Sequence, residues 1–550
     1  MLYIRALPED IQRWAMSDWT WSDVLAQYHA LETGIGLSAD TAYAHGTTGP
    51  MATSPPVLKD KLGHLFLQTS KKLGISQSDD FNAPGGREGA GIYQFNIRDG
   101  IRDSAAVTLL ASSLLTMPVA LRTQTMVEEM KLSVDEGDPT SWRVSELRGV
   151  DGSGHKWSLP ISRGKKVVAA AGAINTPALL MRSRIGNANI LNESDGLLPP
   201  LVPLPSVGQG LQDHPAVGLV FTVTPPLNAD MVANYKYFSN WTTGHELDKR
   251  LSFGYAAVRA VLGVCRGNYH RSEYLCFDDC VRVIVNVRFP GFSTGAFLKS
   301  GLVDPDDPNA DISTPDLQLT VFPIIIEPHI MKDVLDIEYD RVLVTVAVVS
   351  PKTRYQVKMT KDCEDCDQDG DDSGGGGYEH NKGEQRDGVC GLKGARCKGE
   401  QRGEKEARYS PEVVRGQLHP FDVQRLVKGA RIVRAIFAED PLNTYVTGEA
   451  VPGPSIQSDR DLAQWVTATH TDNSHWCCSA RMGMQPETSV VDGQLKVHGI
   501  SNLYVADASL FPVIPNGNVH STVIAIASLF GRRLANVIAE EMGSKTGHHF

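Results

Sequence analysis

Two histidines near the C-terminal end carry the strongest chemical signal in this 550-residue chain. His475 opens the run His-Trp-Cys-Cys-Ser-Ala-Arg-Met-Gly, and His520 lies 45 positions later in Pro-Asn-Gly-Asn-Val-His-Ser-Thr. An imidazole titrates near neutral pH, so it can take a proton from a substrate and release it again. A second imidazole can hydrogen-bond the same substrate oxygen and fix its position. Either histidine alone could be an ordinary loop residue, so the chemistry depends on elements that bring the two together.

The segments around these histidines predict a strand and a helix. Between the histidines lies Leu503–Val505, a short apolar strand followed by Asp507 and small residues. After His520, apolar residues recur at helical spacing from Val523 to Ile538. The positive N-terminal end of this helix can stabilise negative charge on a bound group.

A second strand–turn–helix is predicted upstream. Lys166–Gly172 is a short apolar run ended by glycine, which is typical of a buried parallel strand. We expect Asn175 or Thr176 to cap the following helix, with Pro177 in its first turn. Such a unit directs free backbone N–H groups at a phosphate or a carbonyl oxygen.

Four segments, in this order along the chain, resemble signatures of the glucose-methanol-choline (GMC) family of flavin-dependent alcohol oxidoreductases. They are Met1–Arg5, Ala171–Gly186, Val207–His214 and the C-terminal block from His475 to Thr522. Three positions depart from the family pattern. Arg184 replaces a usual glycine, Gly210 replaces a usual asparagine, and Cys478-Ser479 replaces a Gly-Thr pair. Each motif alone is modest, but four in the correct order identify the chain as a member of the family.

The resemblance implies an α/β (α+β) fold. An FAD-binding, Rossmann-like domain would be built from discontinuous segments, with an inserted substrate domain that carries an antiparallel sheet. We therefore expect a truncated N-terminal part of the FAD domain in residues 1–222 and a substrate domain in residues 223–454. Residues 455–550 would complete the FAD domain and carry the histidines.

The resemblance also implies the roles of particular residues. His475 would be the base that takes the hydroxyl proton of an alcohol, and His520 its partner, although the two roles may be exchanged. The hydride would go to flavin N5. The residues expected to contact FAD are Asp507, Ala508, Asn518, Val519, Val127, Ala171 and Gly172. The substrate would be a small primary or secondary alcohol, and the electron acceptor oxygen or a quinone-like carrier.

One family feature is absent from the chain, because no Gly-x-Gly-x-x-Gly fingerprint opens it. The resemblance implies that the opening βαβ unit, with its phosphate-binding turn, should precede Met1. We therefore expect a truncated member of the family, with that fingerprint encoded upstream of Met1. The alternative is a non-catalytic, GMC-derived protein that does not hold FAD because this unit is missing.

Other segments complete the predicted organisation. Aromatic residues in 8–32 predict two short helices with a turn near Trp19, and residues 423–437 predict a longer helix. Alternation in Asp316–Phe322 and β-branched residues in Arg341–Val349 predict antiparallel strands. Residues 361–406 lack apolar periodicity and are rich in glycine and charge, so we expect a disordered insertion.

Cysteines and His214 receive structural interpretations. No metal site is predicted, although zinc remains an open alternative for two loose clusters, Cys363, Cys366, Cys390 and Cys397, and Cys265, His270, Cys276 and Cys280. Cys477 and Cys478 are interpreted as small packing residues. His214, which follows Asp213, is interpreted as a structural histidine.

The overall composition excludes several classes of protein. A net charge of −11 argues against a nucleic-acid-binding protein. No apolar run approaches the length of a membrane helix, so no membrane segment is expected. The first residues lack the pattern of a secretory signal, which makes the cytoplasm the default compartment and leaves the location open.

Overall fold

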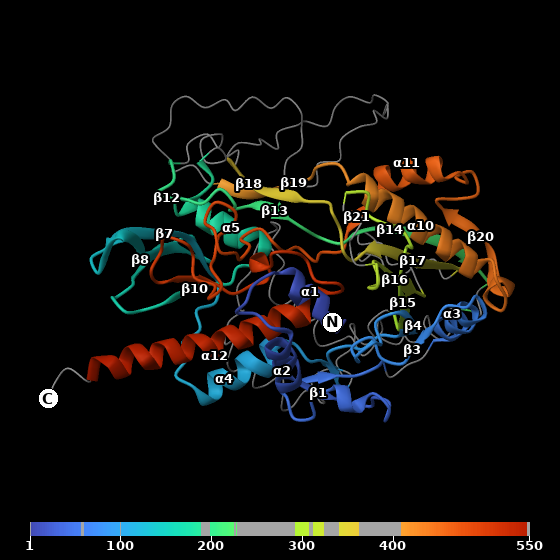
Figure 1. The fold of residues 1–550 in the computed structure, drawn as a ribbon, viewed down its shortest axis with the longest axis horizontal. Helices are drawn as coiled ribbons and strands as arrows, with labels where there is room; N and C mark the ends of the chain where they lie inside the picture. The colour runs from blue at the N-terminus through green and yellow to red at the C-terminus, as the bar shows by residue number, and fades with distance from the viewer. Residues whose placement is uncertain are drawn as a thin grey trace.

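A computed structural model of the chain describes residues 2–56, 60–99, 101–188, 198–224, 227, 292–306, 312–323, 340–361 and 409–546. Two sets of elements lie side by side in Figure 1. One is a large sheet with helices α10 and α11, and the other contains α5, the strands β7 and β8, and the long helix α12. Apart from Lys361, which ends a strand, the expected insertion 361–406 lies outside the described residues, as do both cysteine clusters for which zinc was left open.

The large sheet has eight strands among the described residues, in the order β20-β14-β17-β16-β15-β4-β3, with β21 also paired to β14. The strands are β3 (Gln77–Ser78), β4 (Gly89–Ile92), β14 (Pro215–Val223), β15 (Thr294–Leu298), β16 (Leu317–Phe322), β17 (Arg341–Val348), β20 (Val446–Val451) and β21 (Thr471–Asp472). Every pairing is antiparallel except that of β3 with β4. The helices α3 (Lys61–Lys72) and α10 (Pro420–Phe437) pack on this sheet, and α11 (Asp459–Thr469) packs on α10.

Both strands predicted in the middle of the chain are confirmed. They are β16 and β17, which pair directly, with Leu319 opposite Val346. The sheet also takes β3, β4 and β14 from residues 1–222, and β14 ends at Val223. One sheet therefore joins residues on both sides of the expected boundary at 222/223. The division into three segments remains a prediction.

The other half is organised around two short parallel strands, β10 (Val167–Ala169) and β22 (Leu503–Val505). Its remaining strands are β1 (Glu32–Gly34), β2 (Met51–Thr53), β5 (Ile97–Arg98), β6 (Ile101–Arg102), β7 (Thr125–Asp135), β8 (Asp138–Asp151), β9 (Lys156–Pro160), β11 (Ile185–Gly186), β12 (Val202–Pro203), β13 (Gln209–Leu211), β18 (Tyr355–Lys361) and β19 (Tyr409–Val414). Its helices are α1 (Pro8–Arg13), α2 (Trp21–Leu31), α4 (Ala111–Thr116), α5 (Gly172–Arg182) and α12 (Val519–Thr546). The mixed α/β fold that the sequence predicted is confirmed.

The aromatic N-terminal segment forms two helices, α1 and α2, as predicted. Thr20 caps α2 by accepting a hydrogen bond from the backbone N–H of Asp23. Trp14 stacks on Phe511 with ring centroids 5.1 Å apart, and both side chains are buried. This stacking packs the start of the chain against the segment that leads into α12.

The predicted start of α5 is wrong. The helix begins at Gly172 after Ala171, without a side-chain cap, so Pro177 lies inside it. A proline inside a helix leaves the carbonyl four residues earlier without its N–H donor. That carbonyl belongs to Ala173, and it accepts a hydrogen bond from the Ser479 hydroxyl. A side chain from a distant segment therefore replaces the missing donor and allows the helix to start earlier.

Helix α12 is long and apolar enough to cross a membrane, by length and composition alone. Its segment Val519–Glu541 has a mean hydropathy of 1.4. Thr522, Ala525 and Ile526 in its first half are buried, and 28% of its most apolar window is buried in the protein.

Candidate active site

The segment that begins at His475 lies between two backbone segments that fix its course. Cys477 exchanges two backbone hydrogen bonds with Gln212, each 3.0 Å long. On the other side, the N–H of Cys478 donates to the carbonyl of Ala508 over 3.1 Å. The His475 segment is thereby held beside the turn that follows β22.

Asp213 fixes the backbone of two histidines. Its Oδ1 accepts hydrogen bonds from the N–H of His475 at 2.9 Å and from the N–H of His214 at 2.6 Å. Burial raises the pKa of Asp213 to about 7, although these two hydrogen bonds act in the opposite direction. One carboxyl group therefore holds the backbone from which both imidazole rings project.

The rings of His475 and His214 meet through their Nδ1 atoms, which are 2.9 Å apart. His214 Nε2 lies 3.2 Å from the carbonyl oxygen of Pro515. A carbonyl only accepts, so this nitrogen carries the hydrogen, and a neutral His214 then has a bare Nδ1. With this assignment the hydrogen between the rings sits on Nδ1 of His475, which leaves the lone pair of a neutral His475 on Nε2.

Asn518 faces that lone pair. Its Nδ2 lies 2.8 Å from His475 Nε2 and donates to it. Its Oδ1 accepts from Gln318 Nε2 at 3.3 Å, and the same nitrogen lies 3.3 Å from the hydroxyl of Tyr93. Tyr93 in turn donates to the carbonyl of Leu319 at 2.7 Å. The donor at Gln318 faces Asn518 Oδ1, which fixes the orientation of the Asn518 amide.

Burial keeps both linked histidines neutral. It lowers the pKa of His475 from 6.5 to about 4. The pKa of His214 is lowered well below its ordinary value, mainly by burial and also by the neighbouring His475. At neutral pH His475 is therefore an uncharged base with its electron pair on Nε2, where it accepts a hydrogen bond from the Asn518 amide.

The structure does not join the two histidines that the sequence singled out. None of the hydrogen bonds within the described part of the chain links His520 to His475, and Asn518 occupies that place. His520 lies in the first turn of α12, and its buried Nε2 has no hydrogen-bond partner there. Burial lowers the pKa of His520 to about 4, so it is neutral at pH 7.

Several residues predicted to contact FAD come together at the ends of β10 and β22. Asp507 Oδ2 accepts from the N–H of Gly172 at 2.9 Å and from the hydroxyl of Thr176. Ala171, Gly172 and Ala508 adjoin this carboxylate, and Val519 begins α12. Val127 comes from a different element, β7, which packs against α5.

The residues present fit the flavin-bearing part of FAD. The N-terminus of α5 and the exposed Ala170 and Ala171 lie at the strand end, where Asp507 and Thr176 hold the N–H groups of Gly172 and Ala171. The orphaned Nε2 of His520 offers a further polar contact at the start of α12. These groups could hold FAD, which supplies a hydride acceptor when bound.

Three residues of this hydrogen-bonded chain escaped the sequence interpretation. Asn518 was expected to contact the cofactor only, His214 to be structural, and Gln318 was given no role. Gln318 had a signal, because it is the one amide in a strand of mostly apolar residues and is 3% exposed. Buried polar side chains of this kind need a partner, and here the partner is Asn518.

Asp213, His214 and His475 also place potential metal ligands within 4.8 Å of one another. The two Nδ1 atoms already share a hydrogen, and a metal ion would have to displace it. The cluster is therefore better suited to holding a proton.

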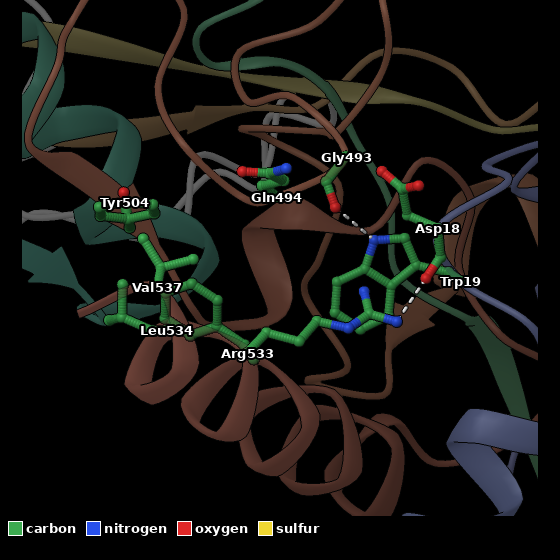
Figure 2. Close-up of a pocket in the computed structure, with 9 residues that line it drawn as sticks. Asp18, Trp19, Gly493, Gln494, Tyr504, Arg533, Leu534 and Val537 are labelled. Atoms are coloured by element: carbon green, nitrogen blue, oxygen red, sulfur yellow. Dashed lines mark hydrogen bonds between the residues drawn. The ribbon is translucent and has the colours of Figure 1, made fainter. Parts of the chain in front are cut away.

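A cavity of about 290 Å³ lies elsewhere, between the start of the chain and α12. Figure 2 shows Arg533 extended beside Trp19, with Tyr504 and Val537 across the cavity. Trp19 donates to the carbonyl of Gly493 at 2.9 Å, and Arg533 donates to the carbonyl of Asp18. None of the catalytic or cofactor residues predicted from the sequence lines this cavity.

Comparison with known proteins matches most of the chain to the GMC family that the sequence motifs resemble. Two family models described as GMC oxidoreductase match residues 1–216 and 408–527. The first match begins at residue 1 and does not confirm the truncated start that the missing fingerprint led us to expect.

Curated relatives and solved structures are similar over nearly the whole chain. An oxygen-dependent choline dehydrogenase of Staphylococcus xylosus is 25% identical over 534 residues, covering 96% of this chain and 77% of the relative. A pyridoxine 4-oxidase structure from Mesorbium loti has a TM-score of 0.66 at 21% identity, covering 98% of this chain and 82% of that one. An Aspergillus oryzae formate oxidase structure has a TM-score of 0.68 at 18% identity, covering 99% and 82%. The chain therefore belongs to the GMC oxidoreductase family, whose members use FAD to oxidise the CH–OH group of their substrates.

Proposed function

We propose that this chain oxidises a small primary or secondary alcohol to an aldehyde or ketone, with His475 as the base and FAD as the cofactor. The observation that carries the proposal is the chain of hydrogen bonds from Pro515 to Asn518, which leaves the lone pair of His475 on Nε2. A non-catalytic, GMC-derived protein would have no need to keep this base neutral and oriented.

His475 and Asn518 have different roles at the alcohol oxygen. The alcohol hydroxyl replaces the Asn518 N–H at the lone pair of His475 Nε2, which then takes the hydroxyl proton, and the Asn518 amide donates to the oxygen as negative charge develops on it. When bound, FAD supplies the acceptor for the hydride that leaves the alcohol carbon. Asp507, Ala171, Gly172, Ala508 and Val519 would hold the cofactor at the strand ends. His520 would contribute a polar contact from the start of α12.

The relatives favour oxygen as the electron acceptor. The curated relative is called oxygen-dependent, and the similar structures include oxidases. We therefore propose oxygen, with a quinone-like carrier as the alternative. The alcohol itself is assigned only by class.

The function is tested with purified protein and added FAD. A stable yellow complex that small alcohols bleach in the absence of oxygen, and that air then recolours, is the expected result. A protein that retains no FAD, or whose flavin no alcohol reduces, would contradict the proposed function.

The pH dependence of the reaction follows from the lowered pKa of His475. The neutral ring is the active form, and its pKa is about 4, so activity should persist below pH 6.5 and fall only as the pH approaches 4. The measurement is kcat/KM between pH 4 and 8, with each sample returned to pH 7 to exclude denaturation. Asp213→Asn serves as the control, because the pKa of Asp213 is about 7 and any step at that pH should disappear in the variant. An acid limb that stays near 6.5 in both proteins would contradict a buried, neutral His475.

A further inference from the structure

Asn516, two residues before Asn518, is anchored through every polar group it has. Its backbone N–H donates to Asp10 Oδ2 at 2.9 Å, and its Nδ2 donates to the carbonyl of Pro315 at 2.5 Å. Its backbone carbonyl and its Oδ1 both accept from Arg87 Nη1, at 2.5 and 3.1 Å. Asn516 is 2% exposed. These contacts fix the loop that also carries the Pro515 carbonyl bound by His214.

Arg87 joins three segments of the chain. Besides Asn516, its guanidinium donates to the carbonyl of Phe81 at 3.1 Å and to the carbonyl of Arg5 at 2.5 Å. It also lies over the ring of Phe297, 4.9 Å from the centroid. Five N–H donors in a planar fork allow this pattern, which no other side chain reproduces.

The position of this cation is unusual. Arg87 is 4% exposed, and no carboxylate among the described residues forms an ion pair with it. Burial lowers the pKa of Arg87 to about 10, so the side chain stays charged at neutral pH. Burying a charge without an ion pair costs free energy. The charge of nearby Asp10, the ring of Phe297 and the hydrogen bonds to neutral groups offset this cost, and these hydrogen bonds tie the loop down.

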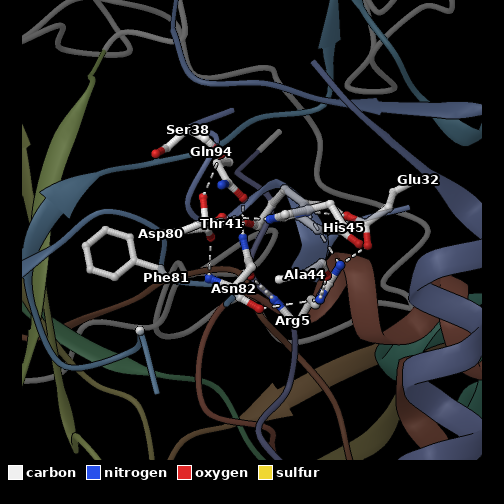
Figure 3. Close-up of polar contacts among 12 residues, drawn as sticks. Arg5, Glu32, Ser38, Thr41, Ala44, His45, Asp80, Phe81, Asn82 and Gln94 are labelled. Atoms are coloured by element: carbon white, nitrogen blue, oxygen red, sulfur yellow. Dashed lines mark hydrogen bonds and ion pairs between the residues drawn. The ribbon is translucent and has the colours of Figure 1, made fainter. Parts of the chain in front are cut away.

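The carbonyl groups of Arg5 and Phe81 accept hydrogen bonds from Arg87, and both residues lie in the network of polar contacts shown in Figure 3. Arg5 forms an ion pair with Glu32, and its backbone N–H donates to Asn82 Oδ1 at 2.7 Å. His45 lies between two carboxylates, with Nδ1 3.0 Å from Glu32 and Nε2 2.7 Å from Asp80. Asp80 and Asn82 flank Phe81, so the backbone on both sides of that carbonyl is held as well.

We propose that Arg87 is a positioning residue for the alcohol oxidation, because it ties the Asn516 loop to the network of Arg5, Glu32, His45 and Asp80 and thereby sets Asn518 against His475. This inference rests on the proposed function. Arg87 has no hydrogen bond to either of the reacting side chains, so it acts only through the loop. The position of Asn518 matters most as charge develops on the alcohol oxygen, so loss of Arg87 should lower kcat more than it changes KM.

The test compares Arg87→Lys and Arg87→Gln with Arg434→Gln. Lysine keeps the charge and loses the fork, so it remains informative where the glutamine variant fails to fold. Arg434 is a matched control: it is mostly buried and pairs with Glu449 at 2.7 Å, on helix α10. Amide hydrogen exchange of the segment 509–522, FAD retention, kcat and KM are measured for each protein.

In both Arg87 variants, amide exchange should increase over the wild type more in 509–522 than in the rest of the chain. Their kcat should be about 10- to 100-fold lower. KM and FAD retention should stay within about twofold, since neither depends on the orientation of Asn518 in the transition state. Arg434→Gln should lower thermal stability and change neither the loop nor kcat.

Unchanged exchange in 509–522, or an increase spread equally over the chain as in the control, would overturn the role of Arg87. An unchanged kcat would do the same. The exchange measurement needs no substrate. A wild-type protein that oxidises no alcohol, combined with a loosened loop in both variants, would therefore reject the proposed function and leave the anchoring of the loop standing.

Discussion

Replacing His475 by alanine should lower kcat/KM for alcohols by about 10²- to 10⁴-fold, the range that a positioned general base supplies. The imidazole is the group whose lone pair faces Asn518, and no other described side chain shares that position. Glutamine should be as inactive, because its amide keeps the bulk and accepts no proton near neutral pH. The measurement is the rate of flavin reduction after rapid mixing with alcohol in the absence of oxygen.

His470→Ala is the matched control for this substitution. His470 follows α11, five positions before His475, and its half-buried ring donates to the carbonyl of Thr467 in its own turn. Its removal should leave the reduction rate within about twofold, because none of the hydrogen bonds described for His475 and Asn518 involves it. Equal losses in both variants, or an unchanged rate without His475, would remove that residue from the chemistry.

The second large effect is expected at Asn518. Alanine there removes the donor that faces the alcohol oxygen, and loss of one such donor typically lowers kcat about 10²- to 10³-fold. The amide also holds the lone pair of His475 in place, at 2.8 Å. The variant should still retain FAD if Asp507 and the strand ends carry most of that binding.

His520→Ala decides which residue is the partner of His475. The sequence favoured His520, whereas the hydrogen bonds of the structure favour Asn518. We expect His520→Ala to cost less than about tenfold in kcat, because its Nε2 makes no bond to the base. If His520→Ala lowers kcat as much as Asn518→Ala does, or more, then His520 is the partner of His475.

Local patterns were enough to predict much of the fold. Strands β16 and β17 follow from side chains that alternate or are β-branched, and helices α1 and α2 follow from aromatic residues at helical spacing. Each of these signals lies within the element that it predicts. The start of α5 could not be predicted in this way, because the donor that replaces the N–H of Pro177 is Ser479, 306 positions from the Ala173 carbonyl.

The candidate site shows the same limit. The motifs located His475 and the 515–522 segment, and their order identified the family. They did not decide between Asn518 and His520, which are two positions apart on either side of the start of α12. That choice depends on Gln318, which lies 200 positions from Asn518 and fixes its amide from the large sheet. Contacts between such distant side chains leave no periodic signal in one sequence.

The central claim is that His475 is a neutral base with its lone pair on Nε2, and nitrogen NMR of ¹⁵N-labelled histidine rings tests it most directly. The His475 signals are assigned by their loss in His475→Gln. At pH 7 we predict a ring that carries its hydrogen on Nδ1 and none on Nε2, in agreement with the hydrogen bond to His214. A ring with its hydrogen on Nε2, or a doubly protonated ring at pH 7, would contradict the account.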